Sequence, residues 1–165
     1  MKIINAFTDG SFIINNGLKF GGIGIYFEDG SKMSKAWCSN KTTNQRMELR
    51  ACIKAIDKFI EQYNGDFTLN VYSDSSYVVN SMNLWMDKWK MKNWRHKKNL
   101  DLIKRLYKLK KICNVKCFHV KSHQSEPPID NIDKWNIWYG NKQADLLATQ
   151  AVKKLIINYN INGIQ

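Results

Sequence analysis

The order of strand-like and helix-like segments is the feature of this sequence that most limits its fold. Three strand-like segments precede the first helix, and single strands then alternate with helices. The predicted strands are residues 2–9, 20–28, 31–38, 67–73 and 114–120, and the predicted helices are residues 44–63, 76–83, 100–112 and 141–157. Strands joined by tight turns pair antiparallel, whereas strands joined through a helix pair parallel. We therefore expect an α/β domain in which an antiparallel meander at one edge of the sheet is continued by parallel strands.

The dipeptide Asp-Gly occurs at Asp9-Gly10 and again at Asp29-Gly30. It is a strong signal for a hairpin turn, because the two central residues of a type I′ turn need positive φ. The second pair joins two strand-like segments, and we expect it to form such a turn. The first pair ends the apolar strand predicted over residues 2–9, so Asp9 serves either a turn or a chemical role.

Length and hydrophobicity set the domain organisation. The chain has 165 residues, of which 44% are hydrophobic, and this suits one globular domain. We expect that domain over residues 1–157, an irregular loop over residues 121–139 that holds both prolines, and a frayed tail at 158–165. No apolar stretch approaches the roughly 20 residues that span a bilayer, and no signal-peptide core follows Lys2. We expect a soluble, intracellular protein that does not enter a membrane.

The charge balance predicts a polyanionic partner. The formal net charge is +12, and lysine supplies 22 of the 26 basic residues. Nucleic acid is the commonest polyanion for such a surface, and lysine favours phosphate contacts over base reading. We therefore expect little sequence preference. Genomic drift toward Lys, Asn and Ile is the alternative explanation.

Two cysteines and two histidines near the third quarter of the chain admit a zinc site as an alternative. They are Cys113, Cys117, His119 and His123. Their spacing does not match a zinc finger, in which about a dozen residues separate the ligand pairs. Reduced thiols, mostly buried, are the favoured interpretation of the four cysteines.

Glu48 is the carboxylate whose position is hardest to explain as surface. It projects with Cys52 toward the apolar side of the predicted helix. A carboxylate there is costly unless something neutralises it. A capping box does not account for it, because with Asn44 as the cap the reciprocal position is Met47. A partly solvated glutamate at the rim of the helix is the alternative.

Three further carboxylates stand at the ends of predicted elements. Asp9 ends the first strand, Asp74 ends the fourth, and Asp145 lies in the first turns of the last helix. Taken singly, they could be a turn residue, a helix cap and a partner of the helix dipole. Together with Glu48 they would form a cluster of hard oxygen ligands. Such clusters hold pairs of Mg²⁺ or Mn²⁺ ions that hydrolyse phosphodiesters.

At this point the sequence resembles type 1 ribonuclease H. The motifs that carry the resemblance are FTDGS (7–11), GGIGIY (21–26), TTNQRMELRA (42–51), YSDSSYV (72–78), HVKSHQS (119–125) and GNKQADLLA (140–148). They stand in family order and cover nearly the whole chain. The resemblance implies a five-stranded mixed sheet of order 3-2-1-4-5 flanked by helices. It also implies hydrolysis of the RNA strand of RNA/DNA hybrids, leaving 5′-phosphate and 3′-hydroxyl ends.

The resemblance assigns roles to five site residues. Asp9, Glu48, Asp74 and Asp145 match the family's four metal-binding carboxylates, which hold two Mg²⁺ ions, with Mn²⁺ as a substitute. His123 matches the family's mobile histidine, which assists proton transfer or product release. Asp9 is then a metal ligand and not only a turn residue.

Residues 84–98 match the family's basic protrusion, which grips the DNA strand. Trp85 and Trp89 are four residues apart and share a helix face, and Trp94 follows after a break. The interleaved lysines expected to bind nucleic acid are Lys88, Lys90, Lys92, Lys97 and Lys98. The alternative is an amphipathic helix whose tryptophans are core and whose lysines are solvated.

The resemblance also implies contacts to the hybrid outside the protrusion. The candidates are Asn16, Thr43, Asn44, Gln45 and Ser76. The sequence departs from the family in the 12–20 loop, at Ser76 in place of a glutamine, and in a longer 126–139 segment. The expected substrate is an RNA/DNA hybrid, and the expected oligomeric state is a monomer.

Two other functions are compatible with parts of this pattern. A basic duplex-binding module without activity would not need four carboxylates at a polyanion-binding face. A resolvase or integrase core shares the carboxylates but not TTNQRMEL or the tryptophan-rich segment.

Overall fold

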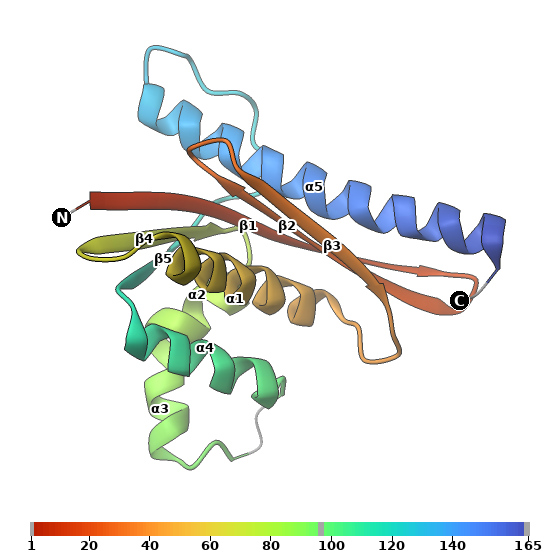
Figure 1. Ribbon diagram of the computed structural model, residues 1–165, viewed down its shortest axis with the longest axis horizontal. Coiled ribbons are helices and arrows are strands. Elements are labelled where there is room, and N and C mark those ends of the chain that lie inside the picture. The colour runs from red at the N-terminus through yellow and green to blue at the C-terminus, as the bar shows by residue number, and fades with distance from the viewer. Residues whose placement is uncertain (1, 96–97, 164–165) are drawn as a thin grey trace.

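The computed structural model describes residues 2–95 and 98–163, so that Lys97 of the expected protrusion lies outside the described residues. One mixed sheet forms its centre, in the order β3-β2-β1-β4-β5 (Figure 1). Its strands are β1 (Lys2–Asn15), β2 (Leu18–Phe27), β3 (Lys32–Cys38), β4 (Phe67–Ser73) and β5 (Val115–His119). The first three strands pair antiparallel, and β4 and β5 continue the sheet in parallel beyond β1. The predicted meander and strand order are confirmed.

Helices cover both faces of the sheet. They are α1 (Asn44–Gln62), α2 (Ser76–Asn80), the π-helical turn η1 (Ser81–Trp85), α3 (Met86–Met91), α4 (Leu100–Ile112) and α5 (Ile132–Asn162). Figure 1 shows α5 along one face, and α1, α2 and α4 on the other, with α3 projecting away from the sheet. Among the described helices, none is both long and apolar enough to cross a bilayer.

Strand β1 is longer than the sequence pattern predicts. Its ladder with β2 continues past Asp9 as far as the pair Asn15–Leu18. The turn that follows is the dipeptide Asn16-Gly17, with φ values of 51° and 76°, as a type I′ hairpin turn requires. The expected end of the strand at Asp9 is therefore wrong. Asn-Gly, and not the first Asp-Gly, is the hairpin signal here.

The second Asp-Gly does form a hairpin turn, as predicted. The Ser31 backbone N–H and hydroxyl both donate to Asp29 Oδ1, at 2.8 and 2.6 Å. The Gly30 backbone N–H closes the turn on the Phe27 carbonyl at 2.9 Å, so the central residues are Glu28 and Asp29, and neither has positive φ. The turn is thus not of type I′, and the Asp29 side chain stabilises it instead.

Helix α5 begins earlier and ends later than predicted. The Asn131 side chain caps it by accepting a hydrogen bond from the Lys134 backbone N–H at 3.2 Å. The prolines at 127 and 128 precede this cap, so they do not interrupt the helix. Residues 132–139 are consequently helical and not part of an irregular loop. Residues 158–162 are helical as well, in place of the expected frayed tail.

Glycine lets α5 pack directly on the sheet. A Cβ atom at Gly24 would lie 2.1 Å from the Ala144 carbonyl oxygen and 2.6 Å from the Ala148 nitrogen. Ala144 and Ala148 are fully buried. Gly24 is also the partner of Asp9 across the β1–β2 ladder. This backbone contact therefore sets the depth at which the next helical residue, Asp145, stands beside β1.

We expect Gly24→Ala to lower the free energy of unfolding by about 1–3 kcal/mol or more, because the added methyl meets main-chain atoms that cannot rotate away. Ser34→Ala is the control, since Ser34 is the exposed β3 partner of Gly24 and should change stability by less than about 0.5 kcal/mol. Urea unfolding of both variants measures the difference. Equal stabilities would contradict the packing argument.

Candidate active site

Asp9 and Glu48 share one hydrogen-bond donor. The Gly10 backbone N–H donates to Asp9 Oδ1 at 2.9 Å and to Glu48 Oε2 at 3.1 Å. Asp9 comes from the middle of β1, and Glu48 comes from the second turn of α1. Their exposed fractions are only 3% and 6%. Two carboxylates from different layers of the fold are thereby held together in a buried position.

Gly10 is needed because β1 and α1 touch at this point. A Cβ atom there would lie 2.6 Å from the Glu48 nitrogen and 2.7 Å from the Met47 carbonyl carbon. No side chain larger than hydrogen fits against those main-chain atoms. The first Asp-Gly of the sequence therefore serves a close helix–strand contact, and the turn interpretation of Asp9 is wrong.

The cap of α1 confirms that Glu48 has no capping role. Thr43 caps the helix, with its hydroxyl accepting from the Arg46 backbone N–H at 3.1 Å. The reciprocal capping-box position is then Arg46, whereas the sequence pattern had suggested Asn44 as the cap and Met47 as its partner. Under either cap Glu48 is left to point into the protein.

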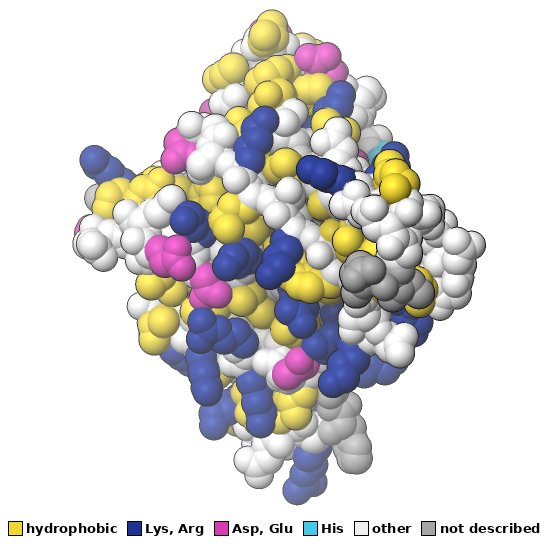
Figure 2. Space-filling model, turned by 45° about the vertical axis from the view of Figure 1, so that its right-hand side comes forward, with side chains coloured by type: hydrophobic (Ala, Val, Ile, Leu, Met, Phe, Trp, Pro, Cys, Tyr) yellow, Lys and Arg dark blue, Asp and Glu magenta, His cyan; other side chains and the backbone are white. Residues whose placement is uncertain are grey.

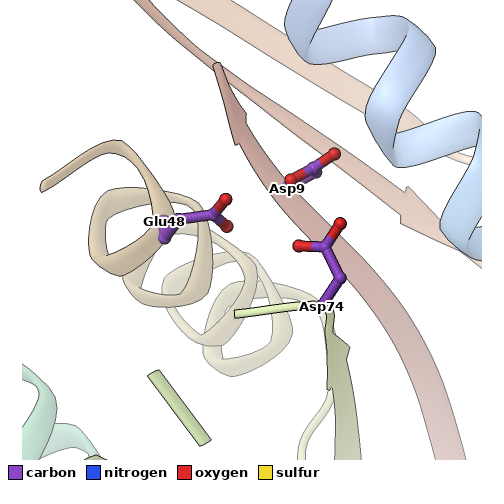
Figure 3. Close-up of side chains that lie close together, drawn as sticks. All are labelled: Asp9, Glu48 and Asp74. Carbon is purple, nitrogen blue, oxygen red and sulfur yellow. The ribbon is translucent and has the colours of Figure 1, made fainter. Parts of the chain in front are cut away.

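Asp74 follows the last residue of β4 and completes a group of three carboxylates. Ser75, and not Asp74, caps α2, by accepting from the Val78 backbone N–H at 3.3 Å. Asp74 is thus free to turn toward Asp9 and Glu48. Ligand atoms of the three side chains lie within 4.8 Å of one another, and Figure 3 shows the carboxylates pointing toward a common centre.

Burial and mutual repulsion make this group costly to ionise. Burial raises the pKa of Asp9 well above its usual range, and the negative charges of Glu48 and Asp74 raise it further. Burial and the charge of Asp74 likewise raise the pKa of Glu48. Burial also raises the pKa of Asp74, in part offset by a hydrogen bond with Asp9 and by the nearby His123. Such a group is stabilised by bound positive charge.

These donors fit a divalent cation of the magnesium class. Mg²⁺ and Mn²⁺ prefer carboxylate oxygens, and all three side chains offer them. Without a cation, burial and mutual repulsion favour the protonated forms of these carboxyl groups. Asp9, Glu48 and Asp74 are therefore the residues that would hold such an ion.

Asp145 and His123 stand beside the three carboxylates. Both line a cleft of about 670 Å³ together with Asp74. A hydrogen bond with the Asp145 carboxyl contributes to the raised pKa of Asp9, so these two groups lie close. Asp145 is not within the group of three. The structure thus brings Asp74, His123 and Asp145 to one cleft, with Asp9 and Glu48 grouped around Asp74. The five expected site residues come from five separate segments of the chain.

The zinc alternative finds no support in the geometry. Among the described residues, the side chains that lie close enough to share an ion are the carboxylates of Asp9, Glu48 and Asp74. The four zinc candidates do not form such a group in that part of the chain. Cys117 is buried, and burial raises the pKa of its thiol to about 12. Burial also raises the pKa of Cys52. These two cysteines are core thiols.

Three of the expected hybrid contacts lie at the start of α1. Thr43, Asn44 and Gln45 are exposed and precede Glu48 within about one turn of helix. Exposed polar side chains beside a carboxylate cluster can reach a bound strand. Their contact with nucleic acid stays a prediction.

Ser76 and Asn16 occupy very different places. Ser76 is exposed at the first position of α2, two residues after Asp74. Asn16 lies at the tip of the β1–β2 hairpin. Because a strand rises about 3.3 Å per residue, Asn16 is roughly 20 Å along β1 from Asp9. The structure therefore brings Ser76, but not Asn16, to the carboxylates.

The sequence pattern did not single out Arg46. Its guanidinium makes two hydrogen bonds to the Asp101 carboxylate, at 2.9 and 2.7 Å. These bonds hold the pKa of Asp101 down at about 2. They join the start of α1 to the start of α4, and so fix the base of the 84–98 segment beside the carboxylates. The sequence alone does not reveal this role of Arg46, because its partner Asp101 on α4 is 55 residues away.

The 84–98 segment projects from the body of the protein as η1, α3 and a bend. Asn93 and Trp94 adopt positive φ, at 53° and 57°, and turn the chain back toward α4. Trp89 and Trp94 pack against the edge of the core, and the Trp94 ring meets the Tyr107 ring edge-on at 5.4 Å. For these two tryptophans the core interpretation is therefore partly correct.

Met86 of this segment is fully buried, whereas its described lysines face outward. Trp85 is half-buried, with its ring 5.5 Å from that of Trp89. The exposed lysines of the 84–98 segment are Lys88, Lys90, Lys92 and Lys98. Figure 2 shows basic side chains over much of one face of the molecule, with few acidic ones between them. The segment is an arm with a packed base and a cationic surface.

Comparisons with known proteins agree with this geometry. The RNase H family model matches residues 1–153 of the chain. The "Ribonuclease H" of Bartonella quintana is 32% identical over 168 residues, which cover 98% of this chain and 94% of that protein.

Two solved structures share the fold. LC9-RNase H1, "a type 1 RNase H with the type 2 active-site motif", has a TM-score of 0.71 at 23% identity, over 93% of this chain and 73% of that one. The foamy viral protease-reverse transcriptase, solved in complex with an RNA/DNA hybrid, has a TM-score of 0.67 at 21% identity, over 90% of this chain and 20% of that one. From the family match and the Bartonella relative together, this chain belongs to the ribonuclease H family.

Proposed function

We propose that this chain is a metal-dependent endonuclease that hydrolyses the RNA strand of RNA/DNA hybrids and leaves 5′-phosphate and 3′-hydroxyl ends. The observation that carries the proposal is the convergence of Asp9, Glu48 and Asp74 beside a cleft that also holds Asp145 and His123. Membership of the ribonuclease H family supports the same activity. The catalytic domain proposed is residues 1–157.

The four carboxylates are proposed to hold two Mg²⁺ ions, for which Mn²⁺ can substitute. When bound, such ions supply an activated water and stabilise the charge on the leaving oxygen. The protein's contribution is to preorganise the ligands. The shared Gly10 N–H fixes Asp9 and Glu48 before any ion arrives, so that less ordering is needed on binding.

His123 is proposed to handle a proton at the mouth of the cleft. Its side chain is exposed, and its charge acts on Asp74. An imidazole changes protonation state near neutral pH, which suits it to give a proton to a leaving group or to weaken the hold on a product.

The hybrid is proposed to lie across the cleft between two contact regions. The polar side chains at the start of α1 face the RNA strand, where a 2′-hydroxyl distinguishes RNA from DNA. The lysines of the 84–98 arm contact phosphates of the DNA strand, with Trp85 against sugars. The foamy viral structure with an RNA/DNA hybrid supports such a substrate for this fold. Phosphate contacts of this kind carry little sequence preference.

Strand-resolved cleavage tests the proposed reaction. With each strand of a hybrid labelled in turn, we expect Mg²⁺-dependent cutting of the RNA strand alone and none in EDTA. Asp74→Asn should abolish cutting while leaving hybrid affinity within about threefold, because it removes an ion ligand but no phosphate contact. Matched RNA/RNA and DNA/DNA duplexes are the controls. Salt-sensitive binding without cutting in Mg²⁺ or Mn²⁺ would favour a non-catalytic binding module instead.

We expect Asp9→Asn to stabilise the metal-free protein increasingly as the pH rises. The native pKa of Asp9 is raised above its unfolded value of about 4, so folding retains a proton that the unfolded chain releases. That contribution to stability is fully present below about pH 4 and is lost as the pH rises toward the native pKa. Asparagine does not ionise, so the advantage of the variant should grow by at most about 1.4 kcal/mol per pH unit.

Urea unfolding of both proteins in EDTA, at about pH 5 and about pH 8, measures this effect. Because only the difference between the two proteins is used, titration of groups that do not interact with Asp9 cancels, and the measured difference reports on the carboxylate cluster. A difference that stays constant with pH would rule out the proposed protonation of the cluster.

We expect removal of two arm lysines to weaken hybrid binding through its salt dependence. Replacing Lys88 and Lys90 by alanine should reduce the slope of log K against log salt by about 1–2, since each lost phosphate contact removes about 0.9 or less. The control replaces Lys153 and Lys154, an exposed pair on α5 with the same charge. Equal slopes for the two double variants would show that net charge alone, and not the arm, binds the hybrid.

A further inference from the structure

The loop that carries His123 is exposed and joins β5 to α5. Residues 121–126 are all exposed, and His123 itself has a φ of 54°. Positive φ is unfavourable for a residue with a side chain and persists only where surrounding contacts hold it. The Val120 backbone N–H fixes the start of the loop on the Ser73 carbonyl at 2.9 Å. Contacts made by residues after Val120 must therefore hold the positive φ of His123.

Two tryptophans of α5 supply that support. The Trp138 indole N–H donates to the backbone carbonyl of Gln124 at 3.0 Å. The Trp135 indole N–H donates to Glu126 Oε1, also at 3.0 Å. Gln124 is the residue next to His123. The Trp138 bond therefore fixes the main chain immediately after the histidine, and the Trp135 bond holds a side chain three residues after it.

The Trp135 ring is itself anchored to the sheet, and the Trp138 ring lies 6.0 Å from the Trp135 ring. The Trp135 ring stacks on the Tyr139 ring, at 4.9 Å and an interplanar angle of 10°. The Tyr139 ring in turn meets the Tyr26 ring of β2 edge-on, at 5.7 Å. One residue later, Gly140 lies so close to β1 that a Cβ would be 2.3 Å from the Phe7 ring. The loop is thus tied to the rigid part of the fold that carries Asp9.

We propose that Trp138, seconded by Trp135, is a positioning residue that holds the His123 loop over the catalytic cleft. This inference rests on the proposed function, because it concerns how His123 of that same site is positioned. Residues 132–139, expected to be part of an expanded loop, instead form the first turns of α5, which bear both indoles. The additional residues restrain the histidine through hydrogen bonds that a plain loop would not supply.

Trp138→Phe tests the proposal, because it removes the N–H and keeps an aromatic ring. We expect kcat to fall about three- to tenfold, the effect of one lost hydrogen bond, with KM changed less than twofold. Trp37→Phe, on β3 and away from the loop, is the matched control and should leave kcat unchanged. Glu126→Gln keeps an oxygen that can accept the Trp135 hydrogen bond and should behave as the wild type. Glu126→Ala and Trp135→Phe both remove this bond, and their effects on kcat should be alike.

The same substitution in a His123→Ala background separates positioning from a general loss of structure. A residue that acts through His123 has nothing left to position there, so Trp138→Phe should then change kcat by less than about 1.5-fold. An equal fall in both backgrounds would overturn the proposal.

A readout without substrate or metal completes the test. Backbone ¹⁵N relaxation of residues 121–126 should show increased motion in Trp138→Phe and none in Trp37→Phe. Unchanged loop dynamics would overturn the proposal whatever the kinetics. A wild-type protein that does not cleave hybrids would defeat the proposed function, and the relaxation data would still decide whether the indoles hold the loop.

Discussion

The close approach of the central strand β1 to helix α1 is the constraint on which the site depends. Gly10 permits the contact, because a Cβ there would collide with the main chain of α1. Its N–H then bonds the carboxylates of Asp9 and Glu48 together. On the other face Gly24, the ladder partner of Asp9, lets α5 come equally close. Two glycines on neighbouring strands thus bring both helical layers to the same short stretch of β1.

The charges at this site and around it indicate what the site binds. Buried carboxylates with raised pKa values oppose folding at neutral pH, and the hydrogen bonds from the Gly10 N–H offset this cost only in part. The surrounding surface is strongly basic, in a chain of net charge +12. A negative centre within a positive surface suits a polyanion whose phosphates are brought to bound cations.

Local sequence signals succeeded where one element decides its own limits. The strand at 67–73 and the helix at 100–112 were predicted at their observed bounds, because apolar periodicity and turn residues suffice there. The pattern predicts strand β1 too short, because the Asn16-Gly17 pair and not Asp9-Gly10 is the hairpin turn. Helix α5 was predicted too short because aromatic residues after the two prolines have no clear helical period. Its cap at Asn131 is visible only in the hydrogen bond that it makes.

The sequence by itself determined the family and the sheet order, because its motifs are contiguous and distinctive. The same motifs singled out five candidate site residues, namely Asp9, Glu48, Asp74, His123 and Asp145. Only the tertiary structure decided how these residues act on one another. The shared Gly10 N–H and the Arg46–Asp101 pair join elements that lie far apart in the chain. The indole bonds to the His123 loop come from residues for which the sequence pattern did not predict a helix. Distances between such elements follow from packing, which no local pattern of residues encodes.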